Sequence, residues 1–127
     1  MTENAIAKEA VDVAYRVHTT LGPGLLESVY ETILANQLEK RNLRVIRRQP
    51  IPLVYDGIQF PIGFRADLVV EGKVIVEIKS IADLTPLHKK QLLTYLRLAD
   101  IRLGLLINFN VARIKDGITR IVNALEE

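Results

Sequence analysis

The segment FRADLVVEGKVIVEIKS, residues 64–80, holds the side chains best suited to chemistry. Glu77 and Lys79 interrupt a run of valine and isoleucine that otherwise suits a protein core, and Asp67 precedes them. A buried charge is costly unless it is paired or bound to a metal. A solvated Glu-x-Lys pair on an exposed sheet face is the ordinary explanation of such a pattern. The apolar neighbours and the preceding acid favour a site in which two carboxylates and an ammonium act together.

The placement of these side chains depends on how two strands pair. Side chains alternate along a strand, so Glu77 and Lys79 share one face while Val76 points to the other. Directly opposed residues of a hairpin also share a face. A two-residue loop would therefore place Asp67 on the face of Val76, whereas an odd-length loop or a bulge would place it with Glu77. The sequence is compatible with either loop, and a functional site requires the odd one.

Three helices are expected. Apolar residues recur at helical spacing over residues 6–21 and again over 26–41, and the GPG segment at 22–24 separates the two patterns. A third helix is predicted over residues 86–100, because Thr85 is a suitable N-cap residue and a proline follows it at the first helical position.

Strands are expected in most of the remaining chain. Residues 43–64 are rich in β-branched and aromatic residues, and an Asp-Gly pair at 56–57 predicts a hairpin turn. Three prolines in this stretch predict strands that are edge-like or bulged. The strand 74–79, the third helix and the strand 103–109 form a βαβ unit, whose two strands should be parallel neighbours. With a last strand over 117–122, this order predicts a mixed α/β sheet with helices on its faces.

Composition limits the classes of function. The chain has 127 residues, 49% of them hydrophobic and 25% charged, and its net charge of +2 does not by itself require a nucleic-acid partner. The absence of cysteine excludes disulfides, thiolate zinc sites and cysteine nucleophiles. No apolar run approaches the roughly 18 residues of a membrane helix, and the first residues form no apolar signal core. A soluble cytoplasmic protein is expected.

The chain resembles the PD-(D/E)XK nuclease superfamily in four features: three sequence motifs and the order of its helices and strands. Asp67 followed after a short hairpin by Glu-x-Lys matches its signature, and the element order matches its αβββαβ core. GLLESVY, residues 24–30, fits the GxxExxY pattern of a family of small stand-alone proteins assigned to that superfamily. QLLTY, residues 91–95, resembles the Q-x-x-x-Y motif of RecB-type nucleases. The resemblance implies a single restriction-endonuclease-like domain over 1–127, although Ala66 stands where the signature has proline.

The resemblance also implies phosphodiester hydrolysis with a divalent cation, Mg²⁺ with Mn²⁺ as a substitute. Such a cation neutralises the phosphate charge and activates water, and Mg²⁺ prefers oxygen ligands. The implied metal contacts are Asp67, Glu77, the backbone carbonyl of Ile78 and Glu27. Lys79 would orient or activate the attacking water and stabilise developing negative charge. For Glu27, a solvated acid at a helix N-terminus is the alternative.

Further residues could bind substrate. By the same analogy Gln91 and Tyr95, one turn apart on a helix, touch phosphate or brace the site, although core packing explains Tyr95 equally well. The run KRNLRVIRR, residues 40–48, has five basic residues in nine. A solvated face is the usual explanation of such a run, but Arg47 and Arg48 could line a path for a phosphate backbone.

The sequence therefore predicts a metal-dependent nuclease, with DNA expected ahead of RNA as its partner and no membrane partner. The main alternative is a non-catalytic nucleic-acid-binding or interaction module that keeps the fold. A small metal-binding protein without a nucleic-acid substrate is a further alternative. Cleavage of both strands of a duplex would need two active sites, for which a homodimer is the simplest arrangement.

Overall fold

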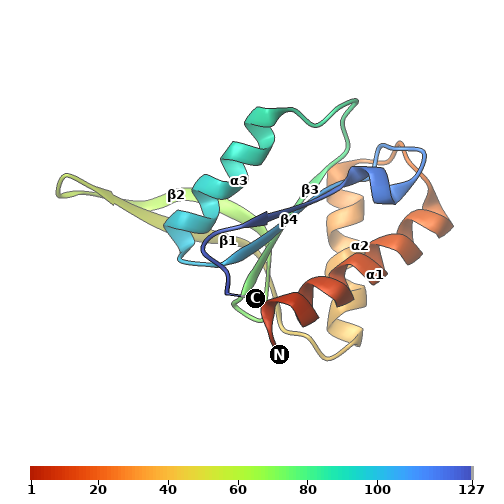
Figure 1. Ribbon diagram of the computed structural model, residues 1–127, viewed down its shortest axis with the longest axis horizontal. Helices are drawn as coiled ribbons and strands as arrows, with labels where there is room; N and C mark the ends of the chain where they lie inside the picture. The colour runs from red at the N-terminus through yellow and green to blue at the C-terminus, as the bar shows by residue number, and fades with distance from the viewer. Residues whose placement is uncertain (127) are drawn as a thin grey trace.

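The fold combines three α-helices with one five-stranded sheet (Figure 1). The structure is a computed structural model and describes residues 1–126. The elements in chain order are α1 (Glu3–Leu21), α2 (Glu27–Lys40), β1 (Val45–Tyr55), β2 (Ile58–Val70), β3 (Val74–Lys79), α3 (Pro86–Ala99), β4 (Leu103–Asn108), the 3₁₀ turn η1 (Ile114–Gly117) and β5 (Ile118–Val122). No helix within the described residues is long and apolar enough to cross a membrane.

The sheet is mixed, as the sequence predicts. Its strands lie in the order β1-β2-β3-β4-β5, and β3 and β4 run parallel while the other neighbours run antiparallel. Helix α3 connects β3 to β4, so the predicted βαβ unit is confirmed. The last strand, predicted over 117–122, forms as β5 beside β4.

Helices cover both faces of the sheet, and each face has its own core (Figure 1). Helices α1 and α2 pack against one face, where Leu68, Val76 and Ile78 point. Helix α3 packs against the other face through Leu92 and Leu96. Because side chains alternate along β3, Glu77 and Lys79 point to the α3 side.

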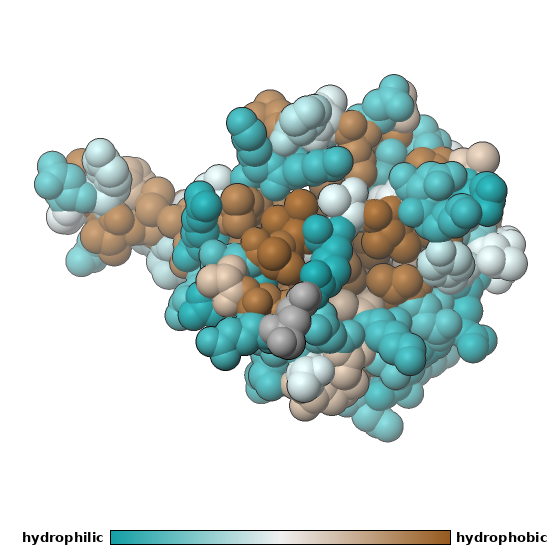
Figure 2. All heavy atoms as spheres, in the orientation of Figure 1, coloured by the Kyte–Doolittle hydropathy of each residue, from teal (hydrophilic) through white to brown (hydrophobic). Residues whose placement is uncertain are grey.

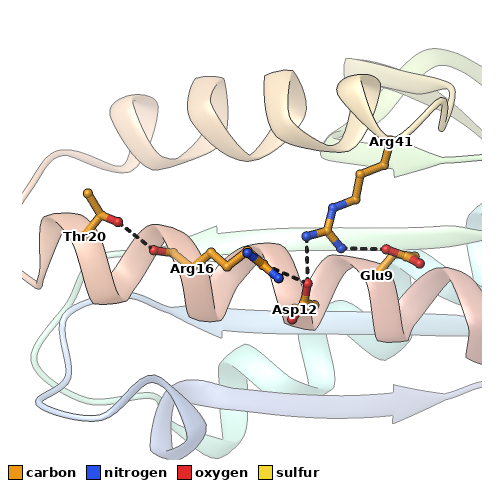
Figure 3. Close-up of polar contacts among 5 residues, drawn as sticks. All are labelled: Glu9, Asp12, Arg16, Thr20 and Arg41. Atoms are coloured by element: carbon orange, nitrogen blue, oxygen red, sulfur yellow. Dashed lines mark hydrogen bonds and ion pairs between the residues drawn. The ribbon is translucent and has the colours of Figure 1, made fainter.

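Helices α1 and α2 are fastened to each other by one arginine of the basic run. Arg41, just past the end of α2, donates to Glu9 Oε2 at 2.6 Å and to Asp12 Oδ2 at 2.7 Å, both on α1 (Figure 3). Arg16 also donates to Asp12 from one turn along α1. The hydrogen bonds from Arg41 and Arg16 lower the pKa of Asp12. Arg41 therefore has a structural role within the fold.

Strands β1 and β2 form a long hairpin whose outer part projects from the body of the protein (Figure 1). Tyr55 pairs with Ile58 across a two-residue turn, in which Asp56 and Gly57 both have positive φ, as the predicted Asp-Gly hairpin requires. The pairing register shifts between Ile51 and Leu53, and β1 lies at the edge of the sheet. The prolines thus indicated both features correctly. We call the outer part, residues 52–63, the arm.

Candidate active site

The loop between β2 and β3 has three residues, so the odd-length alternative is the correct one. Val70 pairs with Val74 across this loop, and Leu68 pairs with Val76. Continuing the same register brings Asp67 opposite Glu77, with both side chains on the α3 face. Glu71 and Gly72 in the loop both adopt positive φ.

The backbone pairing of β2 and β3 stops where the two acids begin. The last paired residues are Leu68 and Val76, and beyond them side chains take over the hydrogen bonding. The Ile78 N–H donates to Asp67 Oδ2 at 2.9 Å, and the Asp67 N–H donates to Glu77 Oε1 at 3.4 Å. The N–H and C=O of one strand residue point to the same side of the strand. The carbonyl of Ile78 therefore faces the same gap as the two carboxylates.

These carboxylates line a pocket of about 220 Å³ between the sheet and α3. Five residues that the sequence analysis selected meet there: Asp67, Glu77, Lys79, Gln91 and Tyr95. The remaining lining residues are Arg65, His88, Leu92 and Leu106. The pocket thus combines two acids with several hydrogen-bond donors.

Glu77 is the most perturbed acid of the pocket. Its side chain is only 6% exposed. Burial, followed by a hydrogen bond with Asp67 and the charge of Asp67, raises the pKa of Glu77 from 4.5 to about 9. The ammonium of Lys79 acts in the opposite direction but does not cancel this effect. Without a cation, Glu77 is therefore protonated at neutral pH, which is typical of two carboxylates that share one site.

Lys79 is half-buried and follows Glu77 on the same face of β3. It forms no salt bridge with any acid in residues 1–126. The Phe109 N–H donates to its backbone carbonyl at 2.9 Å, which holds this end of β3 against the chain that follows β4. Because no acid in residues 1–126 forms a salt bridge with Lys79, its ammonium is available to a ligand in the pocket.

Helix α3 contributes Gln91 and Tyr95 from one face, as their spacing predicts. Gln91 is exposed at the pocket. The ring of Tyr95 stacks on Phe64 of β2 with centroids 3.8 Å apart, so this residue both packs and lines the pocket. Burial and the charges of Glu77 and Asp67 raise the pKa of Tyr95.

Two donors of the pocket, Arg65 and His88, are not among the site residues that the sequence predicts. His88 Nδ1 accepts the Thr85 N–H at 3.0 Å at the start of α3. That bond requires an unprotonated Nδ1, so Nε2 carries the ring proton. Spacing could have identified both residues: Arg65 precedes Asp67 by two positions on a strand, and His88 precedes Gln91 by three on a helix.

Glu27 does not join this pocket. It is the first residue of α2 and lines a separate hollow together with Arg48, Ser80 and Asn110. No group of three or more His, Asp or Glu side chains able to hold a metal lies within residues 1–126. Of the predicted metal contacts, Asp67 and Glu77 line the pocket, the Ile78 carbonyl faces the same gap, and Glu27 lies in the separate hollow. Glu27 occupies the first position of α2, where an acid is favourable.

Two other residues of the GLLESVY segment, Leu25 and Tyr30, make contacts within the fold. Tyr30 is fully buried and stacks on Phe109 with centroids 4.3 Å apart. Its hydroxyl donates to the Gly22 carbonyl at 2.6 Å and accepts the Leu25 N–H at 3.2 Å. Ser80 Oγ also donates to the Leu25 carbonyl, which fixes the loop before α2 to the end of β3.

The two selected arginines both lie near one buried acid, Glu31 of α2. Arg47 donates to Glu31 Oε2 at 2.9 Å and to Thr32 Oγ1 at 2.9 Å. Arg48 Nε lies 3.7 Å from the same carboxylate oxygen, but its side chain is 70% exposed. Arg47 is thus engaged within the fold, whereas Arg48 has an exposed side chain and lines the same hollow as Glu27.

Comparison with protein families identifies the family to which the chain belongs. A family model described as the PD-(D/E)XK nuclease superfamily matches residues 4–121 of the chain. The chain belongs to the PD-(D/E)XK nuclease superfamily. The five-stranded mixed sheet flanked by helices agrees with the restriction-endonuclease-like fold of that superfamily. No curated protein and no solved structure matches the chain significantly.

Proposed function

We propose that this protein is a metal-dependent nuclease whose active site is the pocket between β2, β3 and α3. The observation that carries the proposal is the pairing of Asp67 with Glu77 where the ladder between β2 and β3 ends, with Lys79 in the same pocket. Superfamily membership supports nuclease activity as the reaction class. Membership in the narrower GxxExxY family stays a prediction.

The donor set suits a hard divalent cation, Mg²⁺ or Mn²⁺. Two carboxylates and the Ile78 carbonyl offer oxygen atoms alone, which Mg²⁺ prefers. The raised pKa of Glu77 reflects two acids in one partly dry gap, an arrangement that a cation would relieve. When bound there, a divalent cation supplies Lewis acidity, through which it neutralises phosphate charge and makes water more acidic.

The two acids and the lysine of the pocket would have different roles in the reaction. Asp67 and Glu77 would hold the cation, and Asp67 also fixes the end of β3 through the Ile78 N–H. Lys79 would stabilise the negative charge that develops on the phosphate and orient the attacking water. Both roles require an ammonium that is not already paired, as in this pocket.

The other hydrogen-bond donors of the pocket would bind the substrate. Gln91, Arg65 and the Nε2–H of His88 line the pocket and can donate to phosphate oxygens. Arg47 and Arg48 stay proposed phosphate contacts outside the pocket. Arg48 is the stronger candidate because its side chain is exposed, whereas the guanidinium of Arg47 donates a hydrogen bond to Glu31.

The proposal is tested with a panel of labelled single-stranded and double-stranded DNA and RNA, incubated with Mg²⁺, with Mn²⁺ and with EDTA. We expect cleavage of at least one substrate with either cation and none with EDTA. Binding of nucleic acid without cleavage under every condition would favour the non-catalytic module. Metal binding without nucleic-acid binding would favour the small metal-binding protein.

A further inference from the structure

The arm, residues 52–63, exposes large apolar side chains to solvent. Tyr55 is 73% exposed, Val54 63% and Ile58 57%, and Phe60 and Ile62 are also exposed. Figure 2 shows this apolar surface on the projecting hairpin, away from the body of the protein. Exposed apolar residues are ordinary when scattered, but a continuous group of them marks an interaction surface.

The strand pairing gathers three of these exposed side chains, together with the half-buried Leu53, on one face of the arm. Leu53 is paired with Phe60 and Tyr55 with Ile58, and paired residues share a face. Because Leu53 and Tyr55 are two residues apart, both pairs lie on the same face. A two-stranded hairpin is only marginally stable in water without a covering layer. The exposed apolar face of the arm is therefore a candidate for burial against a partner.

The charge of the arm argues against nucleic acid and lipid as that partner. Asp56 is the single charged residue among the twelve residues 52–63. A surface for phosphates or anionic lipids requires lysine or arginine. Pro52 and Pro61 also lack backbone donors, which disfavours the addition of a further strand. The partner should therefore be a protein surface that meets the arm through apolar side chains.

We propose that the arms of two copies of this chain pack against each other across a two-fold axis. An uncharged apolar face is complementary to itself, and a second copy is always available to a newly folded chain. On this shared face Tyr55, Ile58 and Phe60 present roughly 300 Å² of exposed apolar surface, given the size of such side chains and their exposed fractions. Since about 65% of a homodimer interface is apolar, two such faces would bury about 900 Å², the size of a weak, reversible interface.

This proposal is independent of the nuclease activity, and so is its test. Sedimentation velocity of the full chain at micromolar concentration should show a dimer. Ile58→Lys places two like charges near the axis and should give a folded monomer with an unchanged far-ultraviolet circular dichroism spectrum. Leu87→Lys adds the same charge at a side chain that is also 73% exposed, on α3 outside the arm, and should remain a dimer.

A second measurement does not depend on whether the Ile58→Lys protein folds correctly. The chain contains no cysteine, so Tyr55→Cys provides a single thiol on the arm. A short bis-maleimide should join Tyr55→Cys into covalent dimers and leave Leu87→Cys as monomers. A wild type that sediments as a monomer would overturn the proposal, as would an Ile58→Lys protein that dimerises like wild type. Nucleic-acid binding that is lost in Ile58→Lys while wild type is monomeric would likewise overturn it and assign the arm to nucleic acid.

Discussion

Asp67 and Glu77 face each other from β2 and β3, and each carboxylate accepts a hydrogen bond from a backbone N–H across the gap between the strands. The two acids therefore take the place of the next rung of the ladder, which ends at Leu68 and Val76. A gap of this kind exposes backbone and carboxylate oxygens together. It lies at the end of β3 that leads into the α3 crossover, the part of an open α/β sheet where ligand sites gather.

The raised pKa of Glu77 predicts an unusual pH dependence of stability. Its pKa is about 9 in the folded protein against an ordinary value of 4.5, so the folded state binds the proton more tightly. The free energy of unfolding of the metal-free protein should therefore fall as pH rises from 4.5 toward 9. The slope should not exceed about 1.4 kcal/mol per pH unit for one proton. Urea unfolding in EDTA at several pH values measures it.

Glu77→Gln is the matched variant for this experiment, because an amide imitates the protonated acid. At a pH of about 8 it should be more stable than wild type in EDTA, and its pH slope should be flatter. Glu39→Gln, at an exposed acid of α2, should leave the wild-type slope unchanged. A Glu77→Gln protein that unfolds more easily than wild type in EDTA would show that the charged carboxylate stabilises the fold, contrary to this account.

His88 is predicted to contribute a hydrogen bond to substrate through Nε2. His88→Asn keeps an acceptor for the Thr85 N–H but lacks the outer donor, whereas His88→Gln supplies an amide donor farther along the side chain. Both variants should melt close to wild type. Cleavage should fall about 10- to 100-fold in His88→Asn, the value of one hydrogen bond to a charged group, and less in His88→Gln. Equal cleavage by wild type and His88→Asn would remove His88 from the site.

The neighbouring arginines should separate into a structural and a binding residue. Arg47→Ala leaves the buried Glu31 without its closest partner and should lower the free energy of unfolding by about 1–3 kcal/mol. Combining it with Glu31→Gln should recover part of that loss. Chemical denaturation of the three proteins measures both effects. If the Arg47 side chain stabilises the fold only by packing, adding Glu31→Gln should recover none of the lost free energy of unfolding.

Arg48→Ala should affect binding instead. Its melting temperature should stay near that of wild type, because the side chain is exposed and lies at the margin of an ion pair. The slope of log affinity against log salt for duplex DNA should become less negative by about 0.9, the value for one lost phosphate contact. An unchanged slope would assign Arg48 to the solvated surface.

Much of this architecture could be predicted from local patterns. The Asp56-Gly57 turn and the Thr85-Pro86 helix start depend on residues adjacent in sequence, and the structure has both. Alternation along one strand likewise places Glu77 with Lys79. Such features need no knowledge of the rest of the chain.

Other features depend on contacts between distant residues. The three-residue loop that brings Asp67 to Glu77 is decided by strand pairing, for which the sequence permits two registers. Glu27 lies in a hollow of its own because α2 packs on the face opposite α3, and Arg47 is occupied by Glu31, sixteen positions away. Neither relationship has a signal in residue spacing.

A comparison of wild type with Lys79→Ala in two assays shows whether Lys79 acts beside a cation held by Asp67 and Glu77. The first is cleavage of the best substrate in Mg²⁺, and the second is the melting temperature with Mn²⁺ against EDTA. Lys79→Ala should lose at least about 100-fold in cleavage rate, because a charge-stabilising group is removed. It should keep the metal-induced rise in melting temperature, on the order of 10 °C at 100 times the dissociation constant, because an ammonium is not a ligand. Undiminished cleavage by Lys79→Ala would show that Lys79 has no part in the reaction, and a wild-type melting temperature that does not change with Mn²⁺ would show that Asp67 and Glu77 hold no cation.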